Sequence, residues 1–274
     1  MRKVLLAPGV ESSVLGFGCA PILGSVGARS ARRALGCALD AGINHFDVAR
    51  VYGYGQAERL VGSFLKGRRG ELVIASKCGL EATPLAAVLR PLKPVVRWWR
   101  SGSSSGTVAA ATGRRDTRLM RHVRITAKEM ERSLECSLRA LGTDYLDIFL
   151  LHEPHWGLLA WDSIAECAQK LKREGKIRAF GAAFYRAEGL PADPAAGCLD
   201  VWQFNCPRPG ADYESVHRER GQCANVLFSP FRAMNAAVNG GDTLERLWRN
   251  FPQSVILSSM FNPDHIRKNA AKAV

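Results

Sequence analysis

The chain has 274 residues, enough for one large domain, and its 47% hydrophobic and 23% charged residues are ordinary for a globular protein. No apolar run approaches the roughly 20 residues that a membrane-spanning helix needs, and the stretch at residues 1–9 is too short for a signal peptide. We therefore expect a cytoplasmic protein without a membrane partner, while the net charge of +13 leaves anionic partners open.

Elements in the first part of the chain alternate between strands and helices. Residues 3–15 surround Pro8 and Gly9, which predicts a short hairpin. Strands are expected at 14–19, at a run that ends at Asp47, and at 72–76, and helices at 30–41 and 56–65. The strands are short, rich in Val, Ile, Leu and Phe, and flanked by helical patterns, which is typical of buried parallel strands.

The alternation breaks at residues 81–124, which hold Trp98, Trp99, a flexible Ser/Gly stretch at 101–106 and much of the excess positive charge. We expect a long loop insertion that acts either as a lid or specificity wall attracting anionic substrates, or as an inert, solvated segment. A basic segment can also bind nucleic acid, but no recognised nucleic-acid motif accompanies it, so that partner is not expected.

The second part of the chain resumes the alternation. Thr126 is a candidate N-cap for a helix at 127–141, a strand ends at His152, and a helix follows at 161–173. Further strands are expected at 177–182, 201–205, 225–229 and 254–258, and a last helix at 263–273. The helices after the fifth and seventh strands read as short, and prolines interrupt the one after the sixth, so we expect a trimmed barrel on that side.

Four ionisable residues fall at, or just beyond, the carboxyl ends of three successive expected strands: Asp47, Tyr52, Lys77 and His152. Catalytic groups of α/β barrels lie at that end of the strands. The sequence therefore predicts a single (β/α)8 TIM barrel domain over residues 1–274, with an N-terminal hairpin and a long insertion after the third strand.

The same residues resemble the signature of the aldo-keto reductase family. The family pattern Asp-x4-Tyr-Gly-x4-Glu-x3-Gly is followed by a strand-end lysine and a Leu-x-His on the fourth strand. The matching residues are Asp47, Tyr52, Gly53, Glu58, Gly62, Lys77 and His152. The resemblance extends from about residue 3 to 272 with a gap at 81–124, and it implies NAD(P)H-dependent interconversion of a small aldehyde or ketone with an alcohol.

Charge chemistry agrees with the roles that the resemblance implies. A tyrosine is a poor acid near neutral pH, and a neighbouring ammonium favours its phenolate. We expect Tyr52 to be the proton donor, Lys77 and Asp47 to tune it, and His152 to orient the carbonyl oxygen. Taken singly, each residue has a structural alternative, such as a turn aspartate, a solvated lysine or a core histidine, and Tyr54 could compete with Tyr52.

The resemblance also implies cofactor contacts: Gln203, Phe228, Ser229, Ser258, Ser259, His265, Arg267 and Asn269. Two departures stand out, because Ala183 and Phe184 replace the family's Ser-Asn pair, and Ser259 lies where many members have Lys or Gly. NADPH is favoured over NADH, since a 2′-phosphate would meet His265 and Arg267 near a helix N-terminus. The chain lacks the G-x-G-x-x-G fingerprint of a Rossmann fold.

Eight dispersed cysteines form no C-x-x-C pair, so neither a structural zinc site nor a disulfide framework is expected. The lost Ser-Asn pair leaves a second functional hypothesis, a nicotinamide-binding regulatory or interaction subunit with little catalysis. The substrate and the oligomeric state are left open by the sequence.

Overall fold

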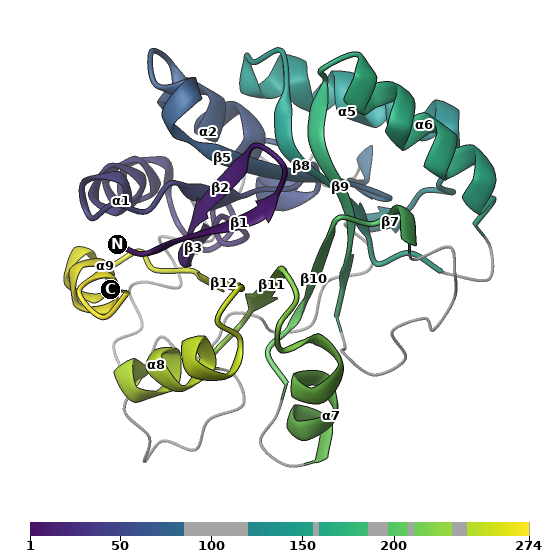
Figure 1. The fold of residues 1–274 in the computed structure, drawn as a ribbon. Helices are drawn as coiled ribbons and strands as arrows, with labels where there is room; N and C mark the ends of the chain where they lie inside the picture. Colours follow the sequence, from purple (N-terminus) through teal and green to yellow (C-terminus); the bar gives the residue numbers. More distant parts are fainter. Residues whose placement is uncertain (85–119, 156–158, 186–196, 208–210, 232–239, 274) are drawn as a thin grey trace.

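A computed structural model describes residues 1–84, 120–155, 159–185, 197–207, 211–231 and 240–273 (Figure 1). Eight parallel strands close into a barrel in which chain neighbours pair and the last strand returns to the first. The predicted (β/α)8 barrel is confirmed. The barrel strands are β3 (Leu15–Gly18), β4 (His45–Asp47), β5 (Val73–Cys78), β8 (Leu146–His152), β9 (Ile177–Phe184), β10 (Val201–Asn205), β11 (Asn225–Phe228) and β12 (Val255–Ser258).

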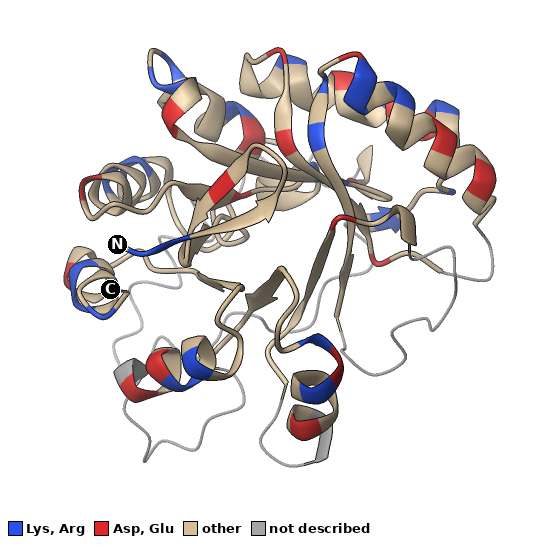
Figure 2. Cartoon of the chain, in the orientation of Figure 1, with Lys and Arg blue, Asp and Glu red and all other residues tan. Residues whose placement is uncertain are grey.

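Helices surround the strands and carry many of the Lys, Arg, Asp and Glu residues (Figures 1 and 2). Their ends follow local rules, as at the helix over residues 127–141, where the Thr126 hydroxyl accepts from Glu129 N and Gly142 ends the helix with φ 65°. The helices are α1 (Ala28–Asp40), α2 (Ala57–Leu65), α5 (Ala127–Leu141), α6 (Trp161–Arg173), α7 (Ala211–Arg220), α8 (Gly240–Asn250) and α9 (Pro263–Ala270), with 3₁₀ turns η1 (Tyr52–Tyr54) and η2 (Arg69–Glu71).

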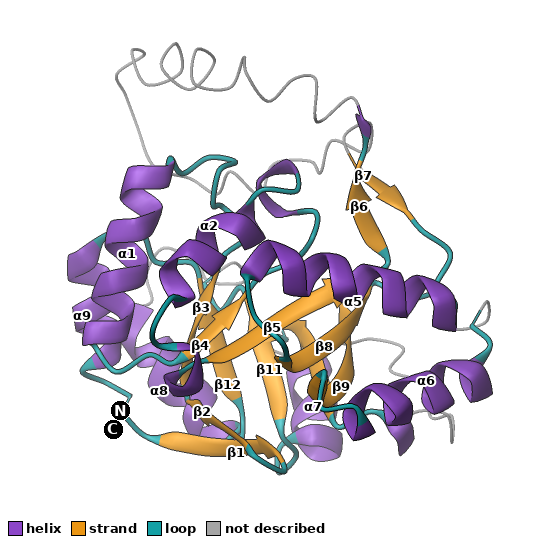
Figure 3. Cartoon of the chain, turned by 90° about the horizontal axis from the view of Figure 1, so that it is seen from above, coloured by secondary structure: helices purple, strands orange, loops and turns teal. Residues whose placement is uncertain are grey.

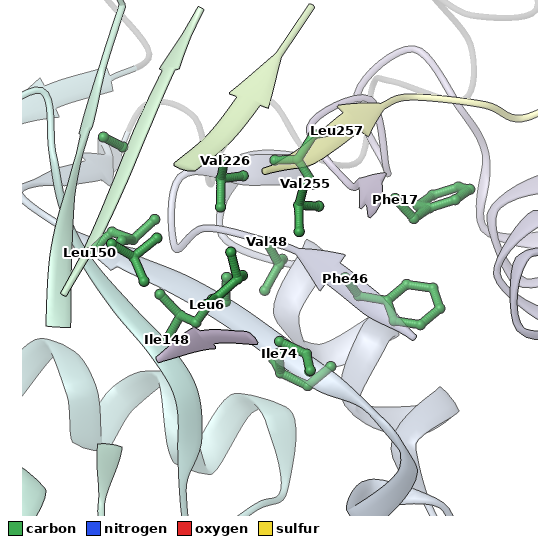
Figure 4. Packing of buried hydrophobic residues seen from close by; sticks show 14 of the residues in the cluster. Leu6, Phe17, Phe46, Val48, Ile74, Ile148, Leu150, Val226, Val255 and Leu257 are labelled. Carbon is green, nitrogen blue, oxygen red and sulfur yellow. The ribbon is translucent and has the colours of Figure 1, made fainter. Parts of the chain in front are cut away.

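The core is built from the apolar strand residues that the sequence pattern singled out (Figure 4). Phe46, Ile74 and Ile148 are fully buried, and each such side chain contributes about 1.5–3 kcal/mol through burial. Gly181 allows β9 to approach β10, because an added Cβ would lie 2.0 Å from the carbonyl oxygen of Val201. The packed core holds the strand ends, and hence the side chains that project from them, in fixed positions.

The predicted N-terminal hairpin is confirmed as β1 (Lys3–Ala7) and β2 (Val10–Ser13), which turn at Gly9 with φ 75°. This hairpin covers the amino-terminal end of the barrel (Figure 3). The two chain ends lie side by side, since Arg2 N donates to Ala273 O over 2.7 Å. The opposite end of the barrel is thereby left for the candidate catalytic residues.

A second hairpin, which the sequence did not predict, forms where the insertion leaves and rejoins the barrel. β6 (Leu80–Ala82) pairs antiparallel with β7 (Met120–His122), and the pair stands at the carboxyl end of the barrel beside α5 (Figure 3). Residues 85–119 lie outside the described part of the chain, with Trp98, Trp99 and the Ser/Gly stretch, so the lid hypothesis stays a prediction.

Several predicted bounds were wrong by a few residues. β9 continues to Phe184, and β11 ends at Phe228 because Ser229 turns to φ 58°. α9 ends at Ala270 rather than at residue 273. The expected short helix after β9 falls largely on residues 186–196, outside the described chain. Among the described helices, none has the length and hydropathy to cross a membrane.

Candidate active site

The structure brings the four candidate catalytic residues together at the carboxyl end of the barrel. Asp47 and His152 end β4 and β8, and Lys77 is the penultimate residue of β5, which pairs with both strands. Tyr52 begins η1, in the loop that follows β4. Three neighbouring strands and one loop therefore carry all four side chains.

Lys77 and Asp47 form a buried ion pair. Lys77 Nζ lies 2.6 Å from each carboxylate oxygen of Asp47 and also donates to Val48 O over 3.2 Å. Burial by itself would lower the pKa of Lys77, but the charge of Asp47 and that of a Tyr52 phenolate outweigh it, so the pKa lies above its ordinary value. The lysine therefore remains an ammonium at neutral pH.

Tyr52 has both the ammonium and the histidine as neighbours. Lys77 Nζ is 5.4 Å from the centre of the Tyr52 ring, and the His152 ring is 6.1 Å away at an interplanar angle of 90°. Gly53 enables the turn that aims the phenol, because its φ is 56° and an added Cβ would lie 2.7 Å from Ile22 O. The phenol thus has one neighbour that is cationic and one that can donate or accept a proton.

Backbone strain gathers at the same end of the barrel. Within the described chain, left-handed φ angles at residues other than glycine occur at Leu23, Tyr54, Glu153 and Ser229, in the loops after β3, β4, β8 and β11. Such conformations cost of order 1–3 kcal/mol each and concentrate at functional sites. This distribution supports the carboxyl end of the barrel as the active site on grounds independent of the side chains.

Gln203, an expected cofactor contact, lies beside the ion pair. Its Nε2 donates to Asp47 Oδ2 over 2.8 Å, and its side chain is almost fully buried. Asn205 lies two residues further along β10, so both project to the same side of the strand. Asn205 Oδ1 is buried and has no hydrogen-bond partner among the described residues. Since side chains two residues apart on a strand point to the same face, the expected contact at Gln203 could have indicated Asn205 as a second one.

The other expected contacts on strands lie around the barrel rim. Phe228 and Ser229 are half-buried at the end of β11, and Ser258 is buried at the end of β12. The Ser259 hydroxyl donates to Gly18 O over 2.9 Å and thereby joins the ends of β12 and β3.

Apolar groups fill the two positions where the family has Ser and Asn. Ala183 and Phe184 are buried, and the Phe184 ring packs 5.6 Å from the ring of Trp202.

The last expected contacts lie on α9, where a neighbouring acid was missed. Asn262 caps the helix by accepting from Asp264 N, and His265 is exposed beside it. Arg267 donates to Asp264 Oδ1 over 2.8 Å, and Asn269 donates to the Met260 sulfur over 3.2 Å. The guanidinium of Arg267, an expected cofactor contact, is therefore paired with Asp264.

These groups suit a nicotinamide dinucleotide. Exposed His265 lies in the first turn of α9, whose N-terminus favours anions, and the exposed cations Arg267 and Lys268 lie in its last turn. At the strand ends, the unsatisfied Asn205 acceptor can take a hydrogen from a carboxamide, and Phe228 offers a ring face. Among the described residues, no group of three or more His, Cys, Asp and Glu side chains could hold a metal ion.

Comparisons with known proteins agree with this geometry. The sequence profile of the Aldo/keto reductase family matches residues 14–191. An aldo-keto reductase of Bacillus subtilis is 29% identical over 201 residues, which cover 71% of this chain and 50% of that protein. The NADH-specific methylglyoxal reductase of Escherichia coli is 32% identical over 168 residues, covering 59% of this chain and 43% of that protein. The chain thus spans about half the length of these curated relatives.

Solved structures share the fold. An aldo-keto reductase of Klebsiella pneumoniae in complex with NADPH has a TM-score of 0.68 and 21% identity to this chain, with 100% of this chain and 90% of that chain covered. At this level of identity the likeness concerns the barrel architecture.

Proposed function

Because the chain belongs to the aldo-keto reductase family, we propose that it reduces an aldehyde or ketone to an alcohol with NADPH, or runs the reverse reaction. The observation that carries the proposal is the buried Lys77–Asp47 pair, which holds an ammonium beside the Tyr52 ring. A solvated lysine or a turn aspartate would have no reason to be desolvated and paired at this end of the barrel.

The four residues divide the work of moving one proton. The bound nicotinamide supplies the hydride. Tyr52 donates the proton that the developing alkoxide requires, and the Lys77 ammonium stabilises the phenolate that this leaves behind. Asp47, held also by Gln203, keeps the ammonium charged and in place. His152, edge-on to the Tyr52 ring, donates to the carbonyl oxygen and orients it.

Different residues would bind the two ends of the cofactor. His265, Arg267, Asn269 and the hydroxyls of Ser258 and Ser259 would hold the adenosine phosphates at α9. Phe228, Ser229, Gln203 and Asn205 would hold the nicotinamide at the strand ends, and Asn205 would replace the polar groups that are absent at Ala183 and Phe184. A structural neighbour from Klebsiella pneumoniae binds NADPH and a relative from Escherichia coli is NADH-specific, so NADH is the alternative.

We propose a small carbonyl compound as substrate, with a preference for anionic ones. Exposed Arg121, His122 and Arg124 lie at the end of the insertion, and exposed His155 lies three residues beyond His152. Rates of reduction for a neutral and a carboxylated aldehyde of similar size, compared at low and high salt, test this preference. The preference fails if both aldehydes respond to salt in the same way.

The test of the function itself begins with binding. The protein is titrated with NADPH and then with NADH, and binding is measured by the quenching of the fluorescence of its six tryptophans. Methylglyoxal is then added to the complex with the cofactor that binds more tightly. Binding with turnover supports the reductase. Binding without turnover over a broad carbonyl panel would favour the regulatory subunit, and binding of neither cofactor would contradict the proposal.

A further inference from the structure

Glu81, in the unpredicted β6–β7 hairpin, joins three separate parts of the molecule. Its carboxylate accepts from Arg132 of α5 over 2.6 Å, from Arg121 of β7 over 3.1 Å, and from Arg50 of the loop after β4 over 3.3 Å. The side chain of Glu81 is only 10% exposed. One carboxylate at the base of the insertion therefore holds a helix, a hairpin strand and the loop that leads to Tyr52.

The charge of Glu81 is secured by its partners. Burial opposes ionisation of the carboxyl, but hydrogen bonds from Arg132 and Arg121 outweigh it, so the pKa of Glu81 lies below its ordinary value. Arg132 is in turn held by Glu129, whose two carboxylate oxygens accept over 2.9 and 2.6 Å. The network is thus anchored in the first turns of α5.

The same hairpin packs against the Tyr52 loop through apolar side chains. Leu80 forms a small buried cluster with Ala49 and Val51, and Met120 and the Tyr52 ring pack against that cluster. The loop itself is stabilised locally by short turns, since Tyr52 N donates to Ala49 O over 3.0 Å and Gly55 N to Tyr52 O over 3.0 Å. The hairpin therefore contacts the Tyr52 loop through the Glu81–Arg50 ion pair and through this apolar cluster, while β5 holds the start of the loop at Val48.

We propose that Glu81 is a positioning residue for the reaction: by holding Arg50 it fixes the loop that keeps the Tyr52 phenol beside Lys77 and His152. The expected loss of turnover rests on the proposed function, whereas the effect of Glu81 on the position of the Tyr52 phenol does not. The base of the insertion is, on this account, part of the active-site framework rather than a point of attachment (Figure 3).

The experiment measures the tyrosinate absorbance of Tyr52 as a function of pH. For each protein, the spectrum of its Tyr52→Phe derivative is subtracted, which removes the signal of the remaining tyrosines. In Glu81→Gln the phenol should drift from the ammonium, and its titration should move to higher pH by about 0.5–1 unit, although loss of the Glu81 charge alone would lower it. Turnover of methylglyoxal should fall about tenfold in kcat, with little change in the KM for NADPH.

Two matched controls separate positioning from stability. Arg121→Gln removes another partner of the same carboxylate, but Arg121 is 59% exposed and outside the loop, so the Tyr52 titration should stay in place. Glu131→Gln removes an exposed ion pair with Lys170 and should also leave the Tyr52 titration unchanged.

The outcomes keep the two claims apart. If Glu81→Gln lowers the Tm while the Tyr52 titration and kcat stay at the parent values, Glu81 is merely structural and the inference is wrong. A shifted titration in a protein that reduces no carbonyl would uphold the positioning role and overturn the proposed reductase. If the parent reduces carbonyls and the Tyr52 titration is the same in Glu81→Gln as in the parent, the reductase is supported and the positioning role of Glu81 is wrong.

Discussion

Lys77 Nζ lies 2.6 Å from both carboxylate oxygens of Asp47, and the two side chains are only 2% and 5% exposed. Removal of either side chain would leave the other charge buried without its partner. The pair is therefore a liability for stability unless it is kept whole, and its retention at the carboxyl end of the barrel is consistent with a functional role.

Breaking this pair on one side should be more damaging than removing it. Lys77→Met leaves the Asp47 carboxylate buried with Gln203, and we expect a loss of about 3–5 kcal/mol in the free energy of unfolding. The double substitution Lys77→Met with Asp47→Leu should recover a large part of that loss. Urea unfolding measures both, and equal stability of the single and double variants would contradict the account.

The network at Glu81 should fail on acidification. Because the folded pKa of Glu81 is depressed, its stabilising effect is present above the unfolded value of about 4.3 and is lost as the pH falls through the folded value. The difference in Tm between the parent and Glu81→Gln should thus be constant near pH 7 and shrink below about pH 4. A difference that grows towards acid pH would reverse the expected sign.

The preference between the two cofactors should depend on the pairing of Asp264 with Arg267. Asp264→Asn removes a negative charge and frees the guanidinium, so NADPH should bind about tenfold more tightly while NADH changes little. Arg267→Ala should weaken NADPH selectively. Fluorescence titration with both cofactors checks this, and equal effects on NADPH and NADH would mean that no 2′-phosphate lies at this turn.

Asn205 should contribute to binding of the nicotinamide end. Its buried Oδ1 lacks a partner among the described residues, and a hydrogen bond gained there would be worth about 0.5–1.5 kcal/mol. Asn205→Leu should therefore weaken both NADPH and NADH by roughly two- to tenfold. Truncated adenosine nucleotides that lack nicotinamide serve as the control, and their affinity should not change.

The barrel could be predicted because its strands are buried on both faces. Runs such as residues 146–152 are almost continuously apolar, and helices such as α5 carry their own start and stop signals at Thr126 and Gly142. The β6–β7 hairpin could not be predicted, because its three-residue strands are separated by the whole insertion and pair through tertiary contacts. The end of β11 was missed because the turn at Ser229 has no glycine to signal it.

The strand-end residues of the candidate site could be predicted from the sequence, but most of the contacts between its side chains could not. Asp47, Lys77 and His152 were expected together because parallel strands end at one face of a barrel. The bond from Gln203 to Asp47 crosses the barrel between strands far apart in sequence, and no local pattern reports it. The contact of Glu81 with Arg50 joins residues 31 apart through tertiary packing and has no local signal, whereas the i,i+3 spacing of Asp264 and Arg267 on a helix could have indicated their pairing.

Turnover of methylglyoxal by Tyr52→Phe, measured with NADPH beside the parent and Tyr54→Phe, tests the central claim most directly. The substitution removes the proton donor and leaves the cofactor contacts intact. We expect NADPH binding to be retained, kcat/KM to fall by about 10²–10⁴-fold, and Tyr54→Phe to stay near the parent. Parent-like turnover by Tyr52→Phe would contradict the assignment of Tyr52 as the acid, and with it the mechanism proposed for this barrel.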